Sequence, residues 1–436
     1  MIDIFMKEKS LKKALACRKI KKPNPVLALI VHAILFCINL SHRVKFTYDY
    51  DKKAMKKEPV ILLAGHASYP EYLYVTVGLG RRDINIVCGY HNFLQKFVYT
   101  ILKKLGVIAK YLYQPDLTSA KQMLSVARRK GSLLLFPEGI QSSSGSHHPI
   151  NPATAQMLKA CKLTVLMCLS EGAYLSRNRY SSDVKRGKIT LHYSVLFTKE
   201  QIATLSVAEI DAIMREKFKY NEFEANRRNR VAYVGKYPNI TGLDKLIYTC
   251  PMCHSESTMK VAGESMTCAS CGFGVKMNAY YDLLPLEEHG PLPFSDIDEW
   301  YKWQRRVMHK AVQSPDFSMT MQAELYTVSD TKLLFKGYSR ILQCRGTLKM
   351  TRAGLSFTDA EGKVLASFES KNVYSLTFIR KGFLEFYYHN EFYIIQPIST
   401  DEPLTKWTIA SEELHNLDDP EWQRVSNEVY HYDLES

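Results

Sequence analysis

A histidine and a glutamate at the end of an apolar run have the types and spacing that acid–base chemistry needs. Ile61 to Glu71 reads I-L-L-A-G-H-A-S-Y-P-E, so His66 stands five positions before Glu71. The apolar run and Gly65 predict a buried strand that enters a tight turn at a sheet edge. Imidazole exchanges a proton near neutral pH, and a carboxylate on its other nitrogen would stabilise the imidazolium. His66 is a candidate general base with Glu71 as its orienting acid; the alternative is a structural histidine.

A second strand end carries a four-residue block. Gly131 to Gly145 reads G-S-L-L-L-F-P-E-G-I-Q-S-S-S-G, an apolar run that ends in Phe136-Pro137-Glu138-Gly139. Together with the upstream H-x4-E pair, this block resembles the glycerolipid acyltransferase family of the lysophosphatidic-acid acyltransferase type. That family carries H-x4-D and F-P-E-G in the same order. The resemblance covers about residues 60–197.

The resemblance implies a reaction and a role for each motif. In the family, the motif histidine takes the proton from the free hydroxyl of a lysophospholipid, and the oxygen attacks an acyl thioester. His66 would be this base, and no nucleophilic side chain is required. The F-P-E-G block would hold the glycerol phosphate of the acceptor. The implied substrate-binding residues are Phe136, Pro137, Glu138, Gly139, Gln141, Ser142 and Lys110. The donor would be acyl-CoA or acyl carrier protein.

The sequence departs from the family pattern in ways that leave the acceptor open. Glu71 replaces the usual Asp, and Ile140-Gln141-Ser142 replaces Thr-Arg-Ser, whose Arg binds phosphate. Lys110 stands where an Arg is common and supplies a point charge without the bidentate fork. The acceptor is then lysophosphatidic acid, another lysophospholipid or a lyso-glycolipid. His147 and His148 are interpreted as surface residues.

Four cysteines predict a metal site of a different kind. Two C-x-x-C pairs, Cys250/Cys253 and Cys268/Cys271, are separated by fourteen residues. Each pair turns two thiolates toward one point, and two pairs complete a tetrahedral S4 shell for one structural Zn²⁺. Such zinc ribbons serve nucleic-acid binding, protein docking or plain stabilisation. This one lacks a dense basic and aromatic stripe, so nucleic acid is not favoured as a partner.

Length and charge limit the class of protein. With 436 residues, two or three domains are expected. The net charge of +14, from 58 basic and 44 acidic residues, suits an anionic membrane surface or anionic substrates. Clustered cysteines in a long chain with no predicted cleavable signal peptide indicate a reducing, cytosolic side.

The N-terminal residues predict membrane attachment. Residues 1–22 alternate apolar and basic side chains, which is typical of an amphipathic helix on anionic lipid; a solvated arm is the alternative. Val26 to Leu40 is mostly apolar but shorter than the roughly 20 residues that a spanning helix needs. We therefore expect peripheral or monotopic attachment to the cytoplasmic face of a membrane, with membrane lipids as partners.

Alternating strands and helices predict an α/β acyltransferase domain. Strands are expected at 60–64, 84–89, 132–136, 163–169 and 188–197, and helices at 92–104, 117–130 and 152–160. The predicted divisions are residues 1–45 (membrane-associating helices), 46–235 (acyltransferase domain), 245–280 (zinc ribbon), 281–318 (linker and short helix) and 319–436 (β-rich). Strands in the last region include Leu333–Tyr338 and Leu384–Gln396. Seven strands and a closing helix at Leu404–Asn416 resemble a PH or GRAM domain.

A non-enzymatic function is the competing hypothesis. The missing phosphate-binding Arg favours a catalytically weak or inactive lipid-binding or lipid-sensing protein. The zinc ribbon alternatively indicates a nucleic-acid-binding or protein-binding module. Acyl transfer and salt-dependent nucleic-acid binding distinguish these classes.

Overall fold

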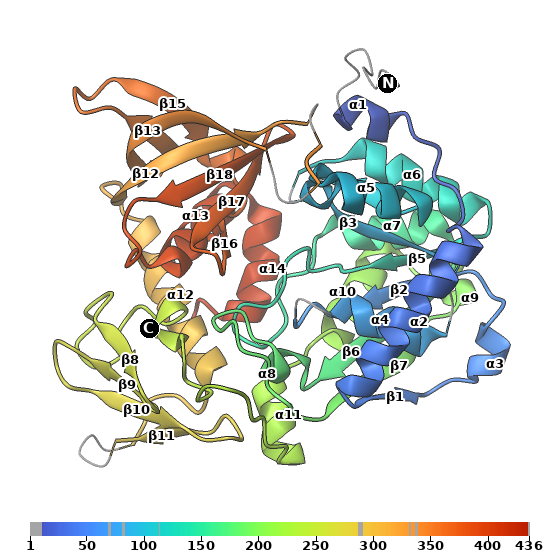
Figure 1. Ribbon diagram of the computed structural model, residues 1–436, viewed down its shortest axis with the longest axis horizontal. Helices are drawn as coiled ribbons and strands as arrows, with labels where there is room; N and C mark the ends of the chain where they lie inside the picture. Colours follow the sequence, from blue (N-terminus) through green and yellow to red (C-terminus); the bar gives the residue numbers. More distant parts are fainter. Residues whose placement is uncertain are drawn as a thin grey trace.

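The computed structural model describes residues 11–68, 71–80, 83–112, 114–286, 291–330, 333–335 and 339–434. An α/β domain, a small four-stranded sheet at the predicted zinc ribbon and a C-terminal β-sheet surround two helices, α12 (Ile297–Val312) and α14 (Pro420–Tyr430) (Figure 1). The first ten residues of the predicted amphipathic helix lie outside the described residues. So does half of the predicted strand Leu333–Tyr338; in its described half, Leu334 makes one isolated bridge to Gln95.

The α/β domain is built on a seven-stranded sheet in the order β1-β7-β6-β2-β5-β3-β4. All neighbours run parallel except β6 and β7. The strands are β1 (Val44–Tyr48), β2 (Val60–Ala64), β3 (Ile84–Gly89), β4 (Ile108–Lys110), β5 (Ser132–Leu135), β6 (Thr164–Glu171) and β7 (Ile189–Phe197). The five predicted strands are therefore confirmed to within two residues at their ends.

Helices on both faces complete this domain. They are α3 (Lys52–Met55), α4 (Glu71–Leu79), η1 (Tyr90–Leu94), α5 (Lys96–Lys104), α6 (Leu117–Arg128), α7 (Ala153–Cys161), α8 (Ala173–Ser176), α9 (Lys199–Thr204), α10 (Val207–Lys217) and α11 (Glu222–Asn229). Helix α10 begins with a capping box between Ser206 and Glu209, a pairing that satisfies backbone groups which the first turn leaves free.

Strand β2 determines where the site forms. All five of its residues are fully buried, as expected for a strand covered on both faces. It pairs with β5 on one side and β6 on the other, with Leu63 opposite Leu135 and Met167. The carboxyl ends of the three parallel strands therefore meet at one edge, and the turns that follow them lie together.

The described part of the N-terminal segment corrects one prediction. Helix α1 (Leu11–Ala16) buries Leu11 and Leu15 against Phe93 and Phe383, so its apolar side packs inside the protein and not on lipid. An amphipathic pattern specifies an apolar partner but not whether that partner is lipid or protein.

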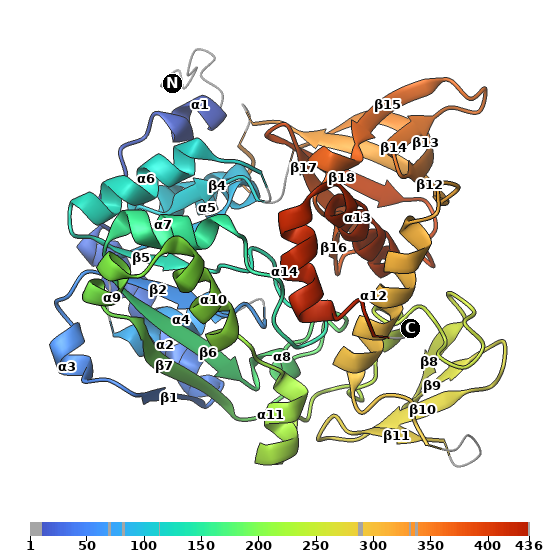
Figure 2. The same cartoon turned by 180° about the vertical axis from the view of Figure 1, so that it is seen from behind.

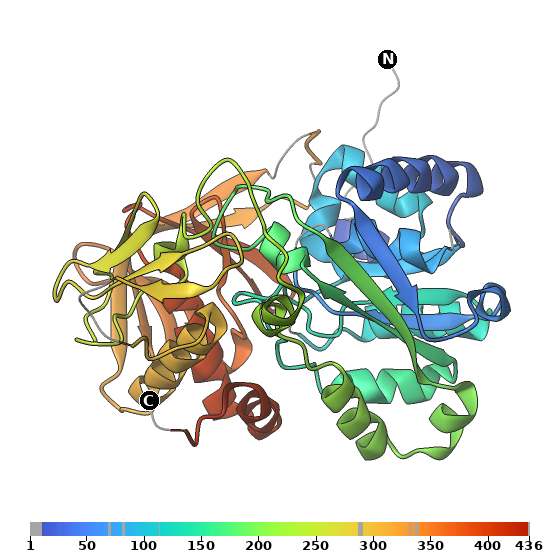
Figure 3. The same ribbon diagram turned by 90° about the horizontal axis from the view of Figure 1, so that it is seen from below.

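Helix α2 (Pro25–Ser41) packs on α4 with one side and leaves the other side open. Figure 3 shows this helix, in dark blue, on the outside of the α/β domain and away from the C-terminal sheet. Its exposed large apolar side chains are Val26, Leu29, Ile30, Ile34, Phe36 and Leu40. Within the part of the chain that the structure describes, no helix has the length and apolarity needed to cross a membrane.

The ribbon is a four-stranded sheet that packs on a long helix. Its strands are β8 (Met259–Ala262), β9 (Ser265–Cys268), β10 (Gly274–Met277) and β11 (Leu283–Pro285), preceded by η2 (Leu243–Lys245). The segment predicted as a linker contains α12 (Ile297–Val312), whose Trp300 and Tyr301 belong to one apolar cluster with the ribbon and the C-terminal sheet. The predicted helix is confirmed, but it is a core element and not part of a free connector.

The C-terminal region is an antiparallel sheet in the order β15-β14-β13-β12-β18-β17-β16. Its elements are β12 (Ser318–Val328), β13 (Arg340–Thr351), β14 (Gly354–Thr358), β15 (Val364–Glu369), η3 (Ser370–Asn372), β16 (Thr377–Ile379), β17 (Phe383–Tyr388), β18 (Glu391–Pro397), α13 (Leu404–Asp418) and α14 (Pro420–Tyr430). In Figure 2, α14 lies between the α/β domain and α13.

One predicted strand in this region is wrong. Leu384–Gln396 forms a hairpin of β17 and β18. The turn residues His389 and Asn390 both have positive φ, at 48° and 62°. Two consecutive residues in the left-handed region reverse the chain in a tight hairpin turn, and this pair is less recognisable than Asn-Gly.

Candidate active site and zinc site

The structure places the predicted base, His66, beside the predicted acid, Glu71. His66 follows β2, and Glu71 is the first residue of α4, so the turn between them brings the two side chains together. His66 Nδ1 lies 3.5 Å from Glu71 Oε2, longer than a hydrogen bond. The Glu71 side chain is 1% exposed and that of His66 is 22% exposed. Catalytic hydrogen bonds are often long before substrate binds, so this distance is compatible with a dyad.

Glu71 has buried polar neighbours that the sequence did not reveal. The Ser170 hydroxyl at the end of β6 donates to Glu71 Oε1 over 2.7 Å and lies 3.4 Å from Glu222 Oε1. Glu222, at the start of α11, also accepts hydrogen bonds from the backbone N–H groups of Gly172 and Tyr174. These contacts fix the orientation of the Glu71 carboxyl group.

Burial keeps the pair uncharged at rest. Desolvation lowers the pKa of His66 to about 4, and the positive charge of Arg179 acts in the same direction. Desolvation also raises the pKa of Glu71 to about 8, against the hydrogen bond from Ser170, which stabilises the ionised form. Between about pH 4 and pH 8, Glu71 is therefore mostly protonated and His66 is a neutral imidazole that can accept a proton.

The Ser170 contact gives a pH prediction. An ionised Glu71 stabilises the imidazolium, so kcat/KM of any reaction that uses His66 as base should rise with pH toward about 8. Ser170→Ala removes a donor to the carboxylate, raises the pKa of Glu71 and should move this limb upward by about one pH unit. A pH–rate profile measures the shift. Ser194→Ala on β7 is the control, and an unmoved limb in Ser170→Ala would exclude Glu71 as its origin.

The F-P-E-G block contacts His66 directly. The Phe136 ring lies 4.7 Å from the imidazole, centroid to centroid, with the planes tilted by 38°. Glu138 Oε1 accepts a hydrogen bond of 2.8 Å from the backbone N–H of His66, and Oε2 accepts one of 2.7 Å from that of His148. Tyr220 also donates to Glu138 Oε2 over 3.2 Å. Glu138 is 2% exposed, and burial raises its pKa to about 7. Because its carboxyl group accepts from the backbone of both His66 and His148, it joins the two motif loops.

The remaining predicted loop residues also lie beside His66. Gly139 has a φ of 76°, which explains glycine in this turn. Pro137 is buried, and its carbonyl accepts from Asn151 over 3.2 Å. The Ser142 N–H donates to the His66 carbonyl over 2.8 Å, and Gln141 supplies a carbonyl to Arg179. The two motifs thus share one loop cluster.

His148 corrects the prediction of a surface residue. Its side chain is 4% exposed, and Nε2 accepts a hydrogen bond of 3.1 Å from the Ser143 N–H. The other ring nitrogen therefore carries the proton, and Nδ1 donates to the Tyr430 hydroxyl over 2.8 Å. His147 is half-buried and lies 3.1 Å from the Tyr220 carbonyl.

Of two basic residues considered for the site, Lys110 lies away from His66, whereas Arg179 reaches the loop after F-P-E-G. Lys110 ends β4, which is three strands from β2 in the sheet order, so the structure does not bring it beside His66. Arg179 follows α8, donates to the Gln141 carbonyl over 2.8 Å and is 6% exposed. A guanidinium therefore reaches the loop after F-P-E-G from a position that the local sequence pattern does not reveal.

The four predicted zinc ligands converge. The Sγ atoms of Cys250, Cys253, Cys268 and Cys271 all lie within 4.8 Å of one another. The Cys250–Cys271 and Cys253–Cys268 separations are 3.6 and 3.7 Å. A tetrahedron with Zn–S distances of about 2.3 Å has edges of about 3.8 Å, so the residues fit Zn²⁺. Four thiolates leave no position for substrate, so the ion would be structural.

The part of the chain that carries this site is similar to a known protein family. Residues 45–170 match the family model described as Acyltransferase. No curated protein is significantly similar to the chain in sequence. Among solved structures, the 1-acyl-sn-glycerophosphate (LPA) acyltransferase PlsC from Thermotoga maritima is similar over 46% of this chain and 79% of that chain, with 12% identity and a TM-score of 0.39. The segment matched by the family model contains His66, Glu71 and F-P-E-G.

Proposed function

Because residues 45–170 match the Acyltransferase family model, we propose that the protein transfers a fatty acyl chain from an acyl thioester to a lysophospholipid. One observation carries the proposal: the imidazole of His66 packs on Phe136, while Glu138 of the same block binds the backbone of His66. A base and the acceptor-binding block implied by the resemblance therefore form one site.

The proposed reaction uses His66 as the proton acceptor. Nε2 takes the proton of the lysophospholipid hydroxyl while that oxygen attacks the thioester carbonyl. The tetrahedral intermediate collapses, the C–S bond breaks, and the imidazolium returns the proton to the thiolate. Glu71 orients Nδ1 and stabilises the imidazolium once the carboxyl group is ionised. No covalent acyl-enzyme forms.

The acceptor proposed first is 1-acylglycerol-3-phosphate. Arg179, which contacts the loop after F-P-E-G, would supply positive charge near its phosphate. The family's phosphate-binding Arg is missing at Gln141, so other lysophospholipids are tested beside it. The donor is acyl-CoA or acyl carrier protein, both of which are anionic and suit the net charge of +14.

Acyl transfer is tested with the purified full chain, a labelled acyl group on each donor and a panel of lysolipid acceptors. Labelled diacyl product from one acceptor supports the proposal and identifies the headgroup. Absence of transfer from both donors to every acceptor, with saturable lysolipid binding, would overturn it in favour of a lipid-binding protein.

We also propose that α2 attaches the protein to the cytosolic face of a membrane. Its open side carries Ile30 and Ile34, which are 52% and 55% exposed, and exposed basic residues stand at both ends of the helix. Replacing both by Glu should lower binding to vesicles of phosphatidylcholine and phosphatidylserine at least about tenfold, because each buried isoleucine contributes about 1.5–3 kcal/mol. Co-sedimentation measures binding. Val364→Glu with Leu365→Glu, on exposed β15, is the matched control; equal binding by both variants would contradict attachment through α2.

The C-terminal sheet is proposed to be PH-like or GRAM-like. Strands β12–β18 form one antiparallel sheet, and α13 follows with Trp407 and Ile409 fully buried, as the resemblance implies for a closing helix.

A further inference from the structure

One carboxylate joins α12 to the loop that follows F-P-E-G. Asp298, in the first turn of α12, is 1% exposed, and its Oδ1 accepts hydrogen bonds of 2.6 Å from the hydroxyls of both Ser144 and Ser146. Its Oδ2 lies 2.8 Å from Lys302 Nζ. Hydrogen bonds to an ionised acceptor are roughly twice as strong as neutral ones. The loop is therefore anchored on the beginning of α12.

This loop reaches the backbone of the candidate base. The Ser142 hydroxyl donates to the Ser146 carbonyl over 2.6 Å and accepts from the Gly145 N–H over 2.9 Å. The Ser142 N–H in turn donates to the His66 carbonyl over 2.8 Å. A displacement of Ser146 is thus transmitted through Ser142 to His66.

The zinc ribbon supports the middle of the same helix. Trp300 Nε1 donates to the carbonyl of Thr249, the residue before the first zinc ligand, over 3.1 Å. Gln304 Oε1 accepts from the Tyr248 N–H over 3.1 Å, and the Phe273 ring packs edge-on against Trp300 at 6.0 Å. Residues just before the first cysteine pair and just after the second therefore contact α12 directly.

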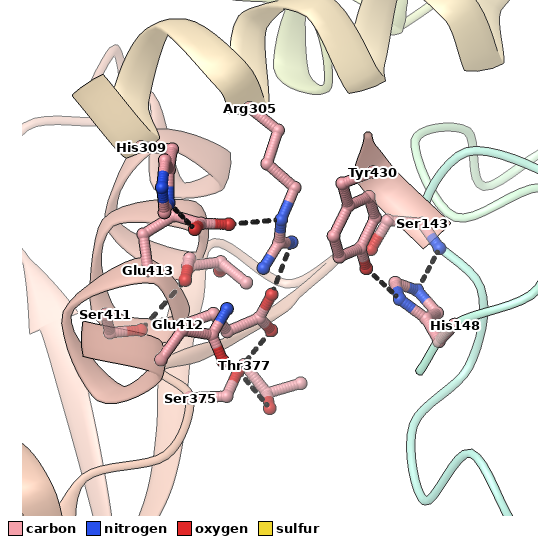
Figure 4. Close-up of polar contacts among 12 residues, drawn as sticks. Ser143, His148, Arg305, His309, Ser375, Thr377, Ser411, Glu412, Glu413 and Tyr430 are labelled. Atoms are coloured by element: carbon pink, nitrogen blue, oxygen red, sulfur yellow. Dashed lines mark hydrogen bonds and ion pairs between the residues drawn. The ribbon is translucent and has the colours of Figure 1, made fainter. Parts of the chain in front are cut away.

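A second tie between α12 and the loop passes through α14 (Figure 4). The Tyr430 ring lies 4.0 Å from the Arg305 guanidinium of α12, and its hydroxyl accepts from His148. Arg305 is itself held by Glu412 over 2.6 Å. The helix that rests on the ribbon thus contributes to both anchors of the loop.

From these contacts we infer that Asp298 is a positioning residue for the loop after F-P-E-G, and that zinc in the ribbon orders this loop through α12. The effect on acyl transfer rests on the proposed function, whereas the order of the loop does not. If the loop frames the acceptor site, Asp298 acts on acceptor binding and leaves donor binding unchanged.

Hydrogen–deuterium exchange on the zinc-loaded full chain tests the inference without activity. Asp298→Asn should accelerate amide exchange in peptides covering 141–148 at least about tenfold, because two charge-assisted hydrogen bonds lose their anionic acceptor. Glu299→Gln removes a neighbouring exposed carboxylate from the same helix turn and should leave this exchange within about twofold. Unchanged exchange in Asp298→Asn would overturn the inference. Should that variant fail to fold, the pair Ser144→Ala and Ser146→Ala tests the same contacts from the loop side.

Zinc removal tests the connection through α12. Chelation of the wild-type chain should accelerate exchange in 141–148, and chelation of Asp298→Asn should add less than in the wild type, because both changes act on one path. Fully additive effects, or a loop that does not respond to chelation, would refute the link to zinc.

In kinetics, Asp298→Asn should raise KM for the lysolipid several-fold and leave KM for the thioester unchanged. A mobile loop with both constants unchanged would overturn the role in acceptor binding, and absence of transfer by the wild type would instead count against the proposed function.

Discussion

Replacing His66 by Gln should lower kcat/KM for acyl transfer by about a thousandfold. General base catalysis contributes about 10²–10⁴-fold, and no other imidazole among the described residues both contacts F-P-E-G through its ring and lies beside Glu71. Glutamine retains a polar side chain of similar length, so the packing against Phe136 changes little. Labelled acyl transfer under single-turnover conditions measures the loss in the chemical step.

His192→Gln is the matched control for this variant. His192 on β7 also stands beside an acid, with Nε2 3.4 Å from Glu171 Oε2, but its side chain is 44% exposed and its Nδ1 lies 2.7 Å from the hydroxyl of Thr47 on the neighbouring strand β1. Its activity should stay within about twofold of the wild type. Retained transfer in His66→Gln, with circular dichroism and unfolding midpoint unchanged, would disprove the assignment of the base.

Replacing Cys271 by Ser should remove the zinc and destabilise the ribbon strongly. Structural zinc contributes about 10–16 kcal/mol of binding free energy in small zinc-finger peptides, so we expect a loss of at least about 3 kcal/mol in the free energy of unfolding. Metal analysis should fall from about one zinc per chain to almost none. Denaturant unfolding, followed by the fluorescence of Trp300 and its neighbours, reports the loss of packing.

Cys17→Ser provides the comparison, because Cys17 and Cys271 are both exposed thiols and only Cys271 lies in the cluster. Its zinc content and unfolding midpoint should match the wild type. A Cys271→Ser chain that keeps one tightly bound zinc per chain would contradict the S4 site.

The motif residues could be predicted from the sequence because they follow strands. Parallel strands β2 and β5 pair directly, so the turns that carry His66 and Glu138 necessarily share one edge of the sheet. The cysteine spacing was equally informative, since a C-x-x-C turn converges two thiolates by local geometry alone.

Other parts of the site depend on contacts that local spacing does not encode. Ser170 reaches Glu71 only because β6 lies next to β2, and Glu222 joins them from the start of α11. The burial of His148 is not evident from the local sequence, because the residue that covers it, Tyr430, is 282 positions away. The partner of helix α1 is hidden from the sequence for a related reason: its apolar residues fit lipid or protein equally well.

The distant contacts of the loop after F-P-E-G have a consequence for biosynthesis. His66 and Glu138 leave the ribosome early, but Asp298 follows Ser144 by 154 positions and Tyr430 follows His148 by 282. Until both later segments have emerged, the nascent chain carries the two motifs without the helices that hold their loop. We therefore expect the active centre to mature after translation of the C-terminal sheet and not with the domain that contains its chemistry.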